Sequence, residues 1–314
     1  MVFNIFIRKL KRFYNDHILW NVGEVVCKKM FKFWQALGFH VTRNFYNEPI
    51  PDTRALKESL WTFPTQLIGI DLNESYQLNL LRDLSKYKDE YNQFPKQPTS
   101  NPVQYYLENP HYQSVDAEIT YSMIRHFKPQ WVMEIGSGYT TTLMAQAVVK
   151  NAESDKHKTD LVVIDYDPRQ HIQKGFPGLS KVIIANMENL DLSTFTQLQK
   201  DDIFFIDSSH VLRIGGDVKY EYLEILPRLN KGVIVHIHDI FLPYEYPKDW
   251  VLGDLRFWTE QYLLQALLTF NNEFEILWAG QYMHRKHPDI LQQAFSSYNP
   301  HTTSPASFWI RRKI

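Results

Sequence analysis

Beyond about residue 116, short apolar runs alternate along the chain with segments of helical length. Runs that are apolar at consecutive positions predict strands buried on both faces, and helices between them predict parallel connections. The sequence therefore predicts an α/β fold built on a doubly wound sheet. One helical face holds Leu255, Trp258 and Tyr262, which is typical of core packing. We expect seven strands, at 131–135, 161–166, 181–185, 202–206, 232–237, 274–279 and 307–311, and helices that include 140–150, 218–229 and 255–270.

Residues 1–115 follow a different pattern, which is aromatic, interrupted by prolines and mainly helical. Apolar positions in 72–84 recur at helical spacing, and 93–102 is rich in proline and polar residues, as surface loops are. We therefore divide the chain into a helical N-terminal extension, 1–115, and a sheet domain, 116–314. The extension and the insert 243–254 are expected to form a lid over the substrate, with aromatic side chains suited to stacking on a sugar.

The N-terminal segment mixes basic and apolar residues at roughly helical spacing, and Lys28, Lys29 and Lys32 continue this pattern. Such a helix either lies on an anionic membrane surface or packs on its own domain or a second subunit; the pattern favours packing on protein. The sequence shows neither an apolar run of about 18 residues nor the features of a signal peptide. We therefore expect a cytoplasmic protein, with peripheral membrane contact and a homo-oligomer as alternatives.

Composition narrows the choice of partners. The formal net charge of −1 gives no reason to expect nucleic acid. The one cysteine, Cys27, rules out an internal disulfide framework and is compatible with a reducing compartment.

The loop after the first predicted strand is suited to binding a nucleotide-like ligand. It contains Glu134, Gly136, Ser137, Gly138 and Tyr139, directly before a predicted helix. The glycines permit a tight turn and a close approach of a ligand to the backbone, and the helix N-terminus offers unpaired N–H groups. Such ligands bind beyond the carboxyl ends of the strands, where the strand order reverses.

Two further strand ends belong to the same predicted site. Asp165 ends the second strand and is placed to accept both hydroxyls of a ribose, and Glu188 follows the third strand, beside the expected adenine. A dinucleotide enzyme requires a third small residue where this chain has Thr141. The Glu-x-Gly-x-Gly pattern instead resembles the first motif of class I methyltransferases, which use S-adenosylmethionine (SAM). The resemblance implies that Glu134 helps to position the amino end of the methionine.

The fourth and fifth predicted strands end in polar clusters, with Asp207 and His210 in one and His238 and Asp239 in the other. If these strands are adjacent, the two aspartates approach within about 5 Å, the spacing of strands, and such a pair suits a hard cation such as Mg²⁺. His210 is the candidate general base that removes the acceptor proton, because its ordinary pKa lies near ~6.5. We name His210, Asp207 and Asp239 as candidate catalytic residues.

The motifs Asp207-x-x-His210 and His238-Asp239 resemble those of the macrocin- and mycinamicin-type sugar O-methyltransferases, and 116–247 resembles bacterial methyltransferases associated with polysaccharide genes. The resemblance implies a Rossmann-like class I methyltransferase fold and transfer of a methyl group to a hydroxyl of a sugar, glycan or small metabolite. It also implies that Asp207 contacts both SAM and a metal, and that Asp207, His238 and Asp239 form the metal site. In that family the second metal motif is an acid followed by Asp, whereas His238 is a softer ligand and less suited to Mg²⁺.

Two alternative functions follow from the same residues. The first is an interaction module that keeps the fold without turnover. The second is a metal-dependent oxygenase with His236, His238 and Asp239 as its two-His-one-carboxylate site. On a straight strand, however, the two histidines point to one face and Asp239 to the other, which disfavours the oxygenase.

Overall fold

The computed structural model describes residues 18–313, which fall into two compact units that divide between Ser59 and Leu60. The described part of the smaller unit contains short helical segments, in which Trp34 Nε1 donates a hydrogen bond to the carbonyl of Val26 at 2.9 Å. These segments are α2 (Ile18–Glu24), η1 (Val25–Lys29), α3 (Phe31–Ala36) and η2 (Thr53–Ala55). The basic N-terminal stretch up to residue 17 lies outside the described residues, so its membrane or packing role stays a prediction.

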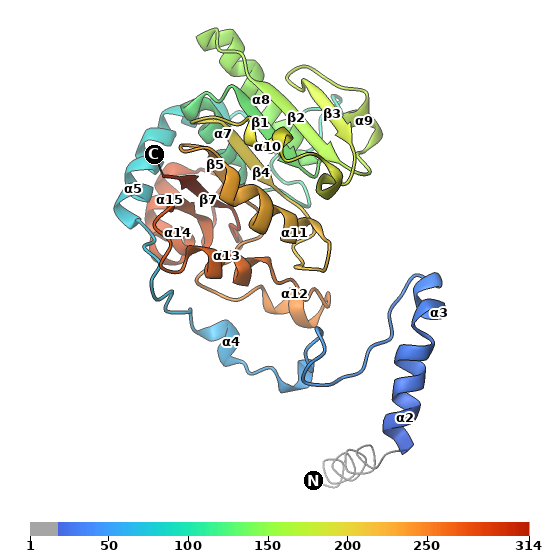
Figure 1. The fold of residues 1–314 in the computed structure, drawn as a ribbon. Coiled ribbons are helices and arrows are strands. Elements are labelled where there is room, and N and C mark those ends of the chain that lie inside the picture. Colours follow the sequence, from blue (N-terminus) through green and yellow to red (C-terminus); the bar gives the residue numbers. More distant parts are fainter. Residues whose placement is uncertain (1–17, 314) are drawn as a thin grey trace. The chain divides into compact units, whose positions relative to one another are not determined.

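The larger unit is built on a seven-stranded sheet with the order β3-β2-β1-β4-β5-β7-β6 (Figure 1). The first five strands in that order are parallel, and β7 runs antiparallel to both β5 and β6. The doubly wound α/β fold is confirmed, whereas the expectation of a wholly parallel sheet is wrong for β7. The strands are β1 (Trp131–Ile135), β2 (Asp160–Asp165), β3 (Lys181–Ile184), β4 (Ile203–Ile206), β5 (Ile234–Ile237), β6 (Phe274–Ala279) and β7 (Phe308–Arg312).

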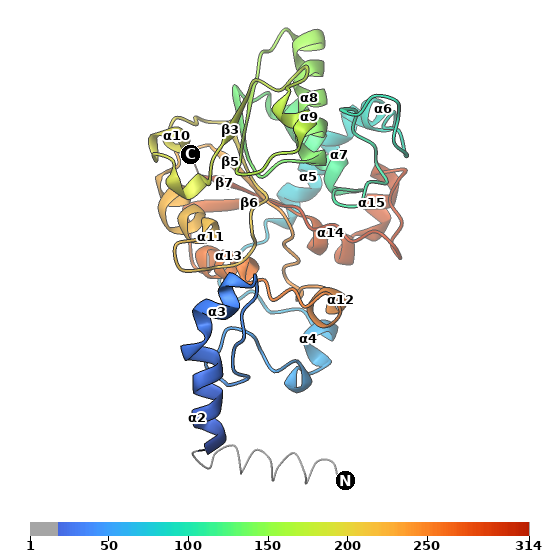
Figure 2. The ribbon, with the colours of Figure 1, turned by 90° about the vertical axis from the view of Figure 1, so that its right-hand side faces the viewer.

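Helices cover both faces of the sheet and bury alternate side chains of the same strands (Figure 2). Val132 and Phe205 belong to one core cluster, and Met133 and Phe204 belong to the other. On the first face lie α5 (Glu74–Leu84), α6 (Lys88–Tyr91), α7 (Asp116–Phe127), α8 (Tyr139–Asp155), α14 (Gly280–Lys286) and α15 (Pro288–Ala294). On the second face lie α10 (Ser193–Thr196), α11 (Asp217–Tyr220), its continuations η5 (Glu221–Ile225) and η6 (Leu226–Arg228), and α13 (Glu260–Leu268). Two-sided burial explains why the strands read as continuous apolar runs.

Short elements complete the larger unit. They are α4 (Ser59–Thr62), η3 (Ser85–Tyr87), α9 (Gln170–Gln173), η4 (Met187–Asn189) and α12 (Lys248–Leu252). The helix expected over 255–270 begins only at Glu260, because Leu255 adopts a left-handed backbone with a φ of +58°. Its expected apolar face is therefore not formed as predicted, and Leu255 and Tyr262 are exposed.

Residues 60–115 pack within the larger unit, so the compact boundary at Ser59 differs from the division expected at residue 115. Helix α5 covers the edge strand β6, where the Gln77 side chain accepts from the Ala279 N–H at 2.8 Å and Asn73 donates to the Ile276 carbonyl at 3.1 Å. An exposed edge would leave such groups unpaired and open to association with another strand. The segment is thus part of the structure that carries the sheet.

Candidate active site

Two adjoining cavities open at the carboxyl ends of β1, β2, β4 and β5. Cavity A, of about 720 Å³, lies over β2 and β3, and cavity B, of about 380 Å³, lies over β4 and β5; Ser137 and Asp207 line both. Their sizes fall in the range of small-molecule sites. Cavity A is lined by Gly136, Asp165, Met187, Glu188, Ser208, Ser209 and Asp217 among others, and cavity B by His111, Tyr112, Gly138, Tyr139, Arg169, His238, Asp239, Arg256 and Trp258 among others.

The glycine loop between β1 and α8 forms the wall between the cavities. Gly136 has a φ of +83°, and a Cβ there would lie 2.3 Å from the carbonyl oxygen of Asp207. No other residue type fits this position, because both the backbone conformation and the space require glycine. At Gly138 a Cβ would meet no atom within 4 Å, so this part of the backbone faces open space. The loop therefore presents bare backbone to a ligand, as the sequence predicts.

Glu134 lies beneath this loop and is not among the described residues that line cavity A or B. Its buried carboxylate accepts hydrogen bonds from the hydroxyls of Thr140 and of Thr141, the latter at 2.7 Å. Burial raises the pKa of Glu134 to about 8. In this structure Glu134 anchors the start of α8 to β1, and its predicted contact with the methionine end of SAM stays a prediction.

Asp165 and Glu188 both line cavity A. The hydroxyl of Ser137 and the N–H of Asp167, at 2.8 Å, both donate to Asp165. Each oxygen of a carboxylate has two acceptor sites, so Asp165 retains the capacity to bind two ligand hydroxyls. Glu188 is half-buried and follows β3, next to the buried side chain of Met187. The structure thus brings both residues to the cavity at which the sequence placed an adenosine.

His210 lies at the centre of a cluster of carboxylates in the second half of the crevice. Its Nε2 is 3.4 Å from Asp207 Oδ1 and 3.5 Å from Asp239 Oδ2, and its Nδ1 is 2.8 Å from Glu260 Oε2. Since β4 and β5 are adjacent, the two aspartates lie on either side of one imidazole, whereas the sequence predicted a direct pair of carboxylates. The hydroxyl of Tyr222 donates to the other oxygen of Glu260 at 3.0 Å.

Both His210 and Asp239 adopt left-handed backbone conformations, with φ of +58° and +56°. Residues other than glycine occupy this region at an energetic cost, and such residues concentrate at functional sites. Strand β5 ends at Ile237, so the left-handed turn at Asp239 returns its carboxylate to the side of His238, at 3.4 Å from Nε2. The expectation that Asp239 points to the opposite face, drawn from a straight strand, is therefore wrong.

The charges of the cluster decide the protonation of His210. Burial by itself lowers the pKa of this imidazole, but the carboxylates of Asp207, Glu260 and Asp239 outweigh burial and raise the pKa well above its ordinary value. Burial raises the pKa of Asp207, and the neighbouring His210 and His238 rings more than offset that effect, so the pKa is lowered overall. The surrounding carboxylates therefore favour the protonated form of His210.

This arrangement does not fit the predicted metal site. Within 18–313, no three His, Cys, Asp or Glu side chains are arranged as ligands for one ion. The reason is that the His210 ring stands between Asp207 and Asp239 and already meets their charge, while His238 pairs with Asp239 alone. The predicted set of Asp207, His238 and Asp239 would have to rearrange before it could bind a cation.

His236 is a core residue and not a ligand. Its ring stacks on Phe205 with centroids 3.7 Å apart, and Nε2 lies 3.4 Å from the hydroxyl of Tyr112. Burial lowers the pKa of His236 well below its ordinary value, so the ring is neutral. The predicted oxygenase site is therefore not formed, because the ring that it requires is packed inside the sheet.

Sequence reasoning missed three residues of the site. Glu260 orients His210, Trp258 packs on the His210 ring with centroids 4.4 Å apart, and Arg256 lies over Trp258 at 5.3 Å. In the sequence, Glu260 appears only as an acid within the helix expected over 255–270, and Trp258 appears as an apolar face residue of the same helix. The buried polar environment that gives each of them a role is formed by residues about 50 positions away.

Comparison with known proteins agrees with this geometry. Residues 133–240 match the family described as a methyltransferase domain. An uncharacterized protein of Archaeoglobus fulgidus is 30% identical over 168 residues, which make up 51% of this chain and 74% of that protein. With its seven-stranded sheet of order 3-2-1-4-5-7-6, the chain belongs to the class I SAM-dependent methyltransferases.

Solved structures resemble this chain over most of its length at low sequence identity. A TDP-rhamnose 3'-O-methyltransferase of calicheamicin biosynthesis has 13% identity and a TM-score of 0.40, over 78% of this chain and 96% of that one. An O-methyltransferase from Bacillus cereus, in complex with SAH, has 11% identity and a TM-score of 0.35, over 75% and 91%. At these TM-scores the likeness adds nothing to the assignment of substrate.

None of the helices in the described residues combines the length and hydropathy of a membrane-spanning segment.

Proposed function

We propose that this protein transfers the methyl group of SAM to a hydroxyl group of a sugar, a glycan or a small metabolite. The observation that carries the proposal is the position of His210, whose Nε2 lies within 3.5 Å of two carboxylates in cavity B and whose Nδ1 is fixed by Glu260. A general base must be oriented toward the proton that it removes. The hydrogen bond to Glu260 fixes the ring so that Nε2 is directed toward Asp207 and Asp239, which line cavity B.

The residues of cavities A and B fit SAM. Asp165 and Glu188 would hold the adenosine, and the backbone from Gly136 to Tyr139 would hold the methionine portion, because Gly138 leaves its backbone open to the cavity. When bound, SAM supplies an electrophilic methyl group on a sulfonium. Asp207 lines both cavities and would stand near the positive charge of that sulfonium.

His210 must lose a proton before it can act as a base, because the ligand-free cluster holds it protonated. Positive charge beside Asp207 opposes the imidazolium and lowers the pKa of His210, since like charges disfavour the charged form. Neutral Nε2 then accepts the acceptor hydroxyl's proton, while Asp207 and Asp239 stabilise the imidazolium that results. The ionic cluster thereby couples the protonation of His210 to occupancy of the crevice.

The proposed transfer requires no metal ion, since His210 already compensates the charge of both aspartates.

We further propose that 60–115 and the insert 243–254 close the acceptor side. Tyr112 lines cavity B, which supports the first part of this lid. Tyr105 and Tyr246 are buried in packing instead, so they are not available to stack on a sugar.

The proposal is tested by titrating the full chain with SAM in a calorimeter and by measuring SAH formation with a panel of mono- and oligosaccharides. We expect SAM to bind and at least one hydroxyl acceptor to yield SAH at a rate that His210→Asn abolishes. Absence of SAM binding would contradict the proposal and support a module without turnover. Equal losses of SAM affinity and turnover in His210→Asn would assign His210 a structural role.

A further inference from the structure

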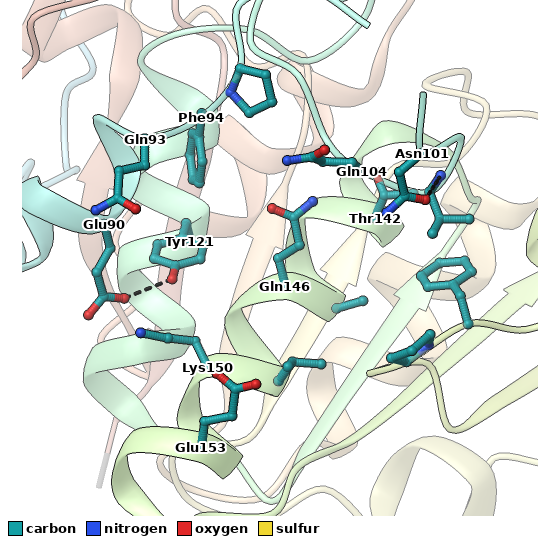
Figure 3. Close-up of a pocket in the computed structure, with 16 residues that line it drawn as sticks. Glu90, Gln93, Phe94, Asn101, Gln104, Tyr121, Thr142, Gln146, Lys150 and Glu153 are labelled. Atoms are coloured by element: carbon teal, nitrogen blue, oxygen red, sulfur yellow. Dashed lines mark hydrogen bonds between the residues drawn. The ribbon is translucent and has the colours of Figure 1, made fainter. Parts of the chain in front are cut away.

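A groove leads away from the reacting centre along one face of α8. Cavity C, of about 140 Å³, shares Gly138, Tyr139 and Arg169 with cavity B. Cavity D, of about 530 Å³, shares Asn101, Gln104 and Thr142 with cavity C (Figure 3). The three cavities therefore adjoin in the order B, C, D.

Helix α8 forms the floor of this groove. Thr142, Ala145, Gln146, Val149, Lys150 and Glu153 line cavity D and recur at the three- and four-residue spacing of one helical face. From Tyr139, at the reacting centre, to Glu153 the helix rises roughly 21 Å at about 1.5 Å per residue. This length exceeds that of a single small metabolite and suits a linear ligand.

Neutral amides and aromatic rings are prominent among the side chains that line cavity D. Gln93, Asn101, Gln104 and Gln146 offer both hydrogen-bond donors and acceptors, and Phe94 and Tyr121 offer ring faces. Amides match hydroxyl groups, which likewise donate and accept, and aromatic rings pack on the C–H faces of a sugar.

Gln146 gives independent evidence that the groove takes a polar ligand. Its Nε2 has no hydrogen-bond partner among the residues that the structure describes. A polar atom without a partner costs free energy, and a ligand hydroxyl in cavity D would relieve that cost. The side chain points into cavity D beside Gln104 (Figure 3).

The charges around cavity D disfavour a polyanionic ligand. Glu90 is bound to Arg125 at 2.8 Å and to the hydroxyl of Tyr121 at 2.7 Å, so its charge is paired. Lys150 stands beside Glu153 on the same face of α8, one turn away. Cavity D thus offers no excess of positive charge for phosphate groups.

We propose that the acceptor is an oligosaccharide or polysaccharide chain, with the sugar that is methylated in cavity B and the following sugars over cavity C and in cavity D. The inference deepens the proposed transfer to a hydroxyl and rests on it. It assigns specificity to the loop 97–106, whose Asn101 and Gln104 line both C and D. The Thr99 hydroxyl donates to Gln104 Oε1 at 2.8 Å and holds the loop in shape.

The experiment measures binding of the full chain to a glycan array that carries mono- to hexasaccharides of neutral sugars, followed by KM for the best series. We expect affinity to rise with length up to several sugars. The variant Gln146→Leu should lose about fivefold of the affinity for the long ligand, roughly the worth of one neutral hydrogen bond, and keep its affinity for the monosaccharide. Gln104→Ala should also lower the affinity for the long ligand.

Matched controls distinguish a failure of the oligosaccharide inference from a failure of the proposed methyl transfer. Gln197→Leu changes an exposed glutamine outside the groove and should leave the length dependence intact. Because Gln146 Nε2 has no partner, Gln146→Leu should fold, and a melting curve checks this. Equal affinity for all lengths, or no binding to the array, overturns the inference while SAM binding and SAH formation still stand. Loss of SAM binding in the unmodified chain overturns the proposed function itself.

Discussion

Replacing Glu260 with Gln isolates the charge that holds His210 in place. The carboxylate lies 2.8 Å from His210 Nδ1, and a glutamine oxygen could still accept the same hydrogen bond. Coulomb's law at an effective dielectric constant of about 20 gives an upper bound of ~6 kcal/mol for two charges at that distance. Measured effects of one opposite charge amount to about 1–3 pKa units, or ~1.4–4 kcal/mol.

The carboxylates around His210 determine the direction in which its pKa changes. Glu260 is among the groups that raise the pKa of His210, so Glu260→Gln should lower that pKa. NMR titration of the His210 ring measures this shift directly, and the acid limb of the pH–rate profile should move down with it. Tyr222→Phe is the matched control, since it removes a hydrogen bond to Glu260 and leaves its charge.

The same shift makes a prediction about stability. A histidine whose pKa is raised in the fold contributes stability that is fully present below its unfolded pKa of ~6.5 and is lost as pH rises through the folded value. In urea denaturation, the free energy of unfolding of the wild type should therefore exceed that of Glu260→Gln most below pH 6.5. The difference between the two free energies should shrink at higher pH. An unchanged His210 pKa in Glu260→Gln, or a stability difference that grows with pH, would refute the reasoning.

Four further outcomes test the site. His210→Asn should lower turnover by about 10²–10⁴-fold without weakening SAM binding in calorimetry; a parallel loss of affinity contradicts the role of base. Asp165→Asn should weaken both SAM and SAH by about 10–100-fold, and an unchanged Kd would remove Asp165 from the adenosine site. Chelation with EDTA should leave turnover unchanged. If EDTA lowered turnover and added Mg²⁺ restored it, the enzyme would require a metal ion. Because the pKa of Glu134 is raised to about 8, stability should fall by a few kcal/mol between pH 4.5 and 8, and Glu134→Gln should flatten that decline.

The sequence predicted the fold because burial on both faces of a strand leaves a local trace. The apolar runs that became β1, β4 and β6 could be located from their own residues, and so could the glycine loop that β1 positions. It also predicted that Asp207 and Asp239 would meet, since the ends of parallel strands share one edge of a sheet. These features depend only on neighbouring residues and on the topology that they imply.

Other features depended on contacts between distant segments. The antiparallel direction of β7 leaves no mark in its apolar pattern, because a strand is equally buried in either direction. Glu134 has the position of a ligand-binding acid in its motif, yet Thr140 and Thr141 hold it beneath the loop. The left-handed turns at His210 and Asp239 are likewise fixed by packing and not by local preference.

By itself, then, the sequence determined the position of the strands, the glycine loop after β1 and the candidates Asp207, His210 and Asp239. The tertiary structure alone decided their protonation, because it brought Glu260 from 50 positions away to the buried Nδ1 of His210. A pKa depends on the burial of a group and on the charges around it, and the neighbouring residues in the sequence determine neither.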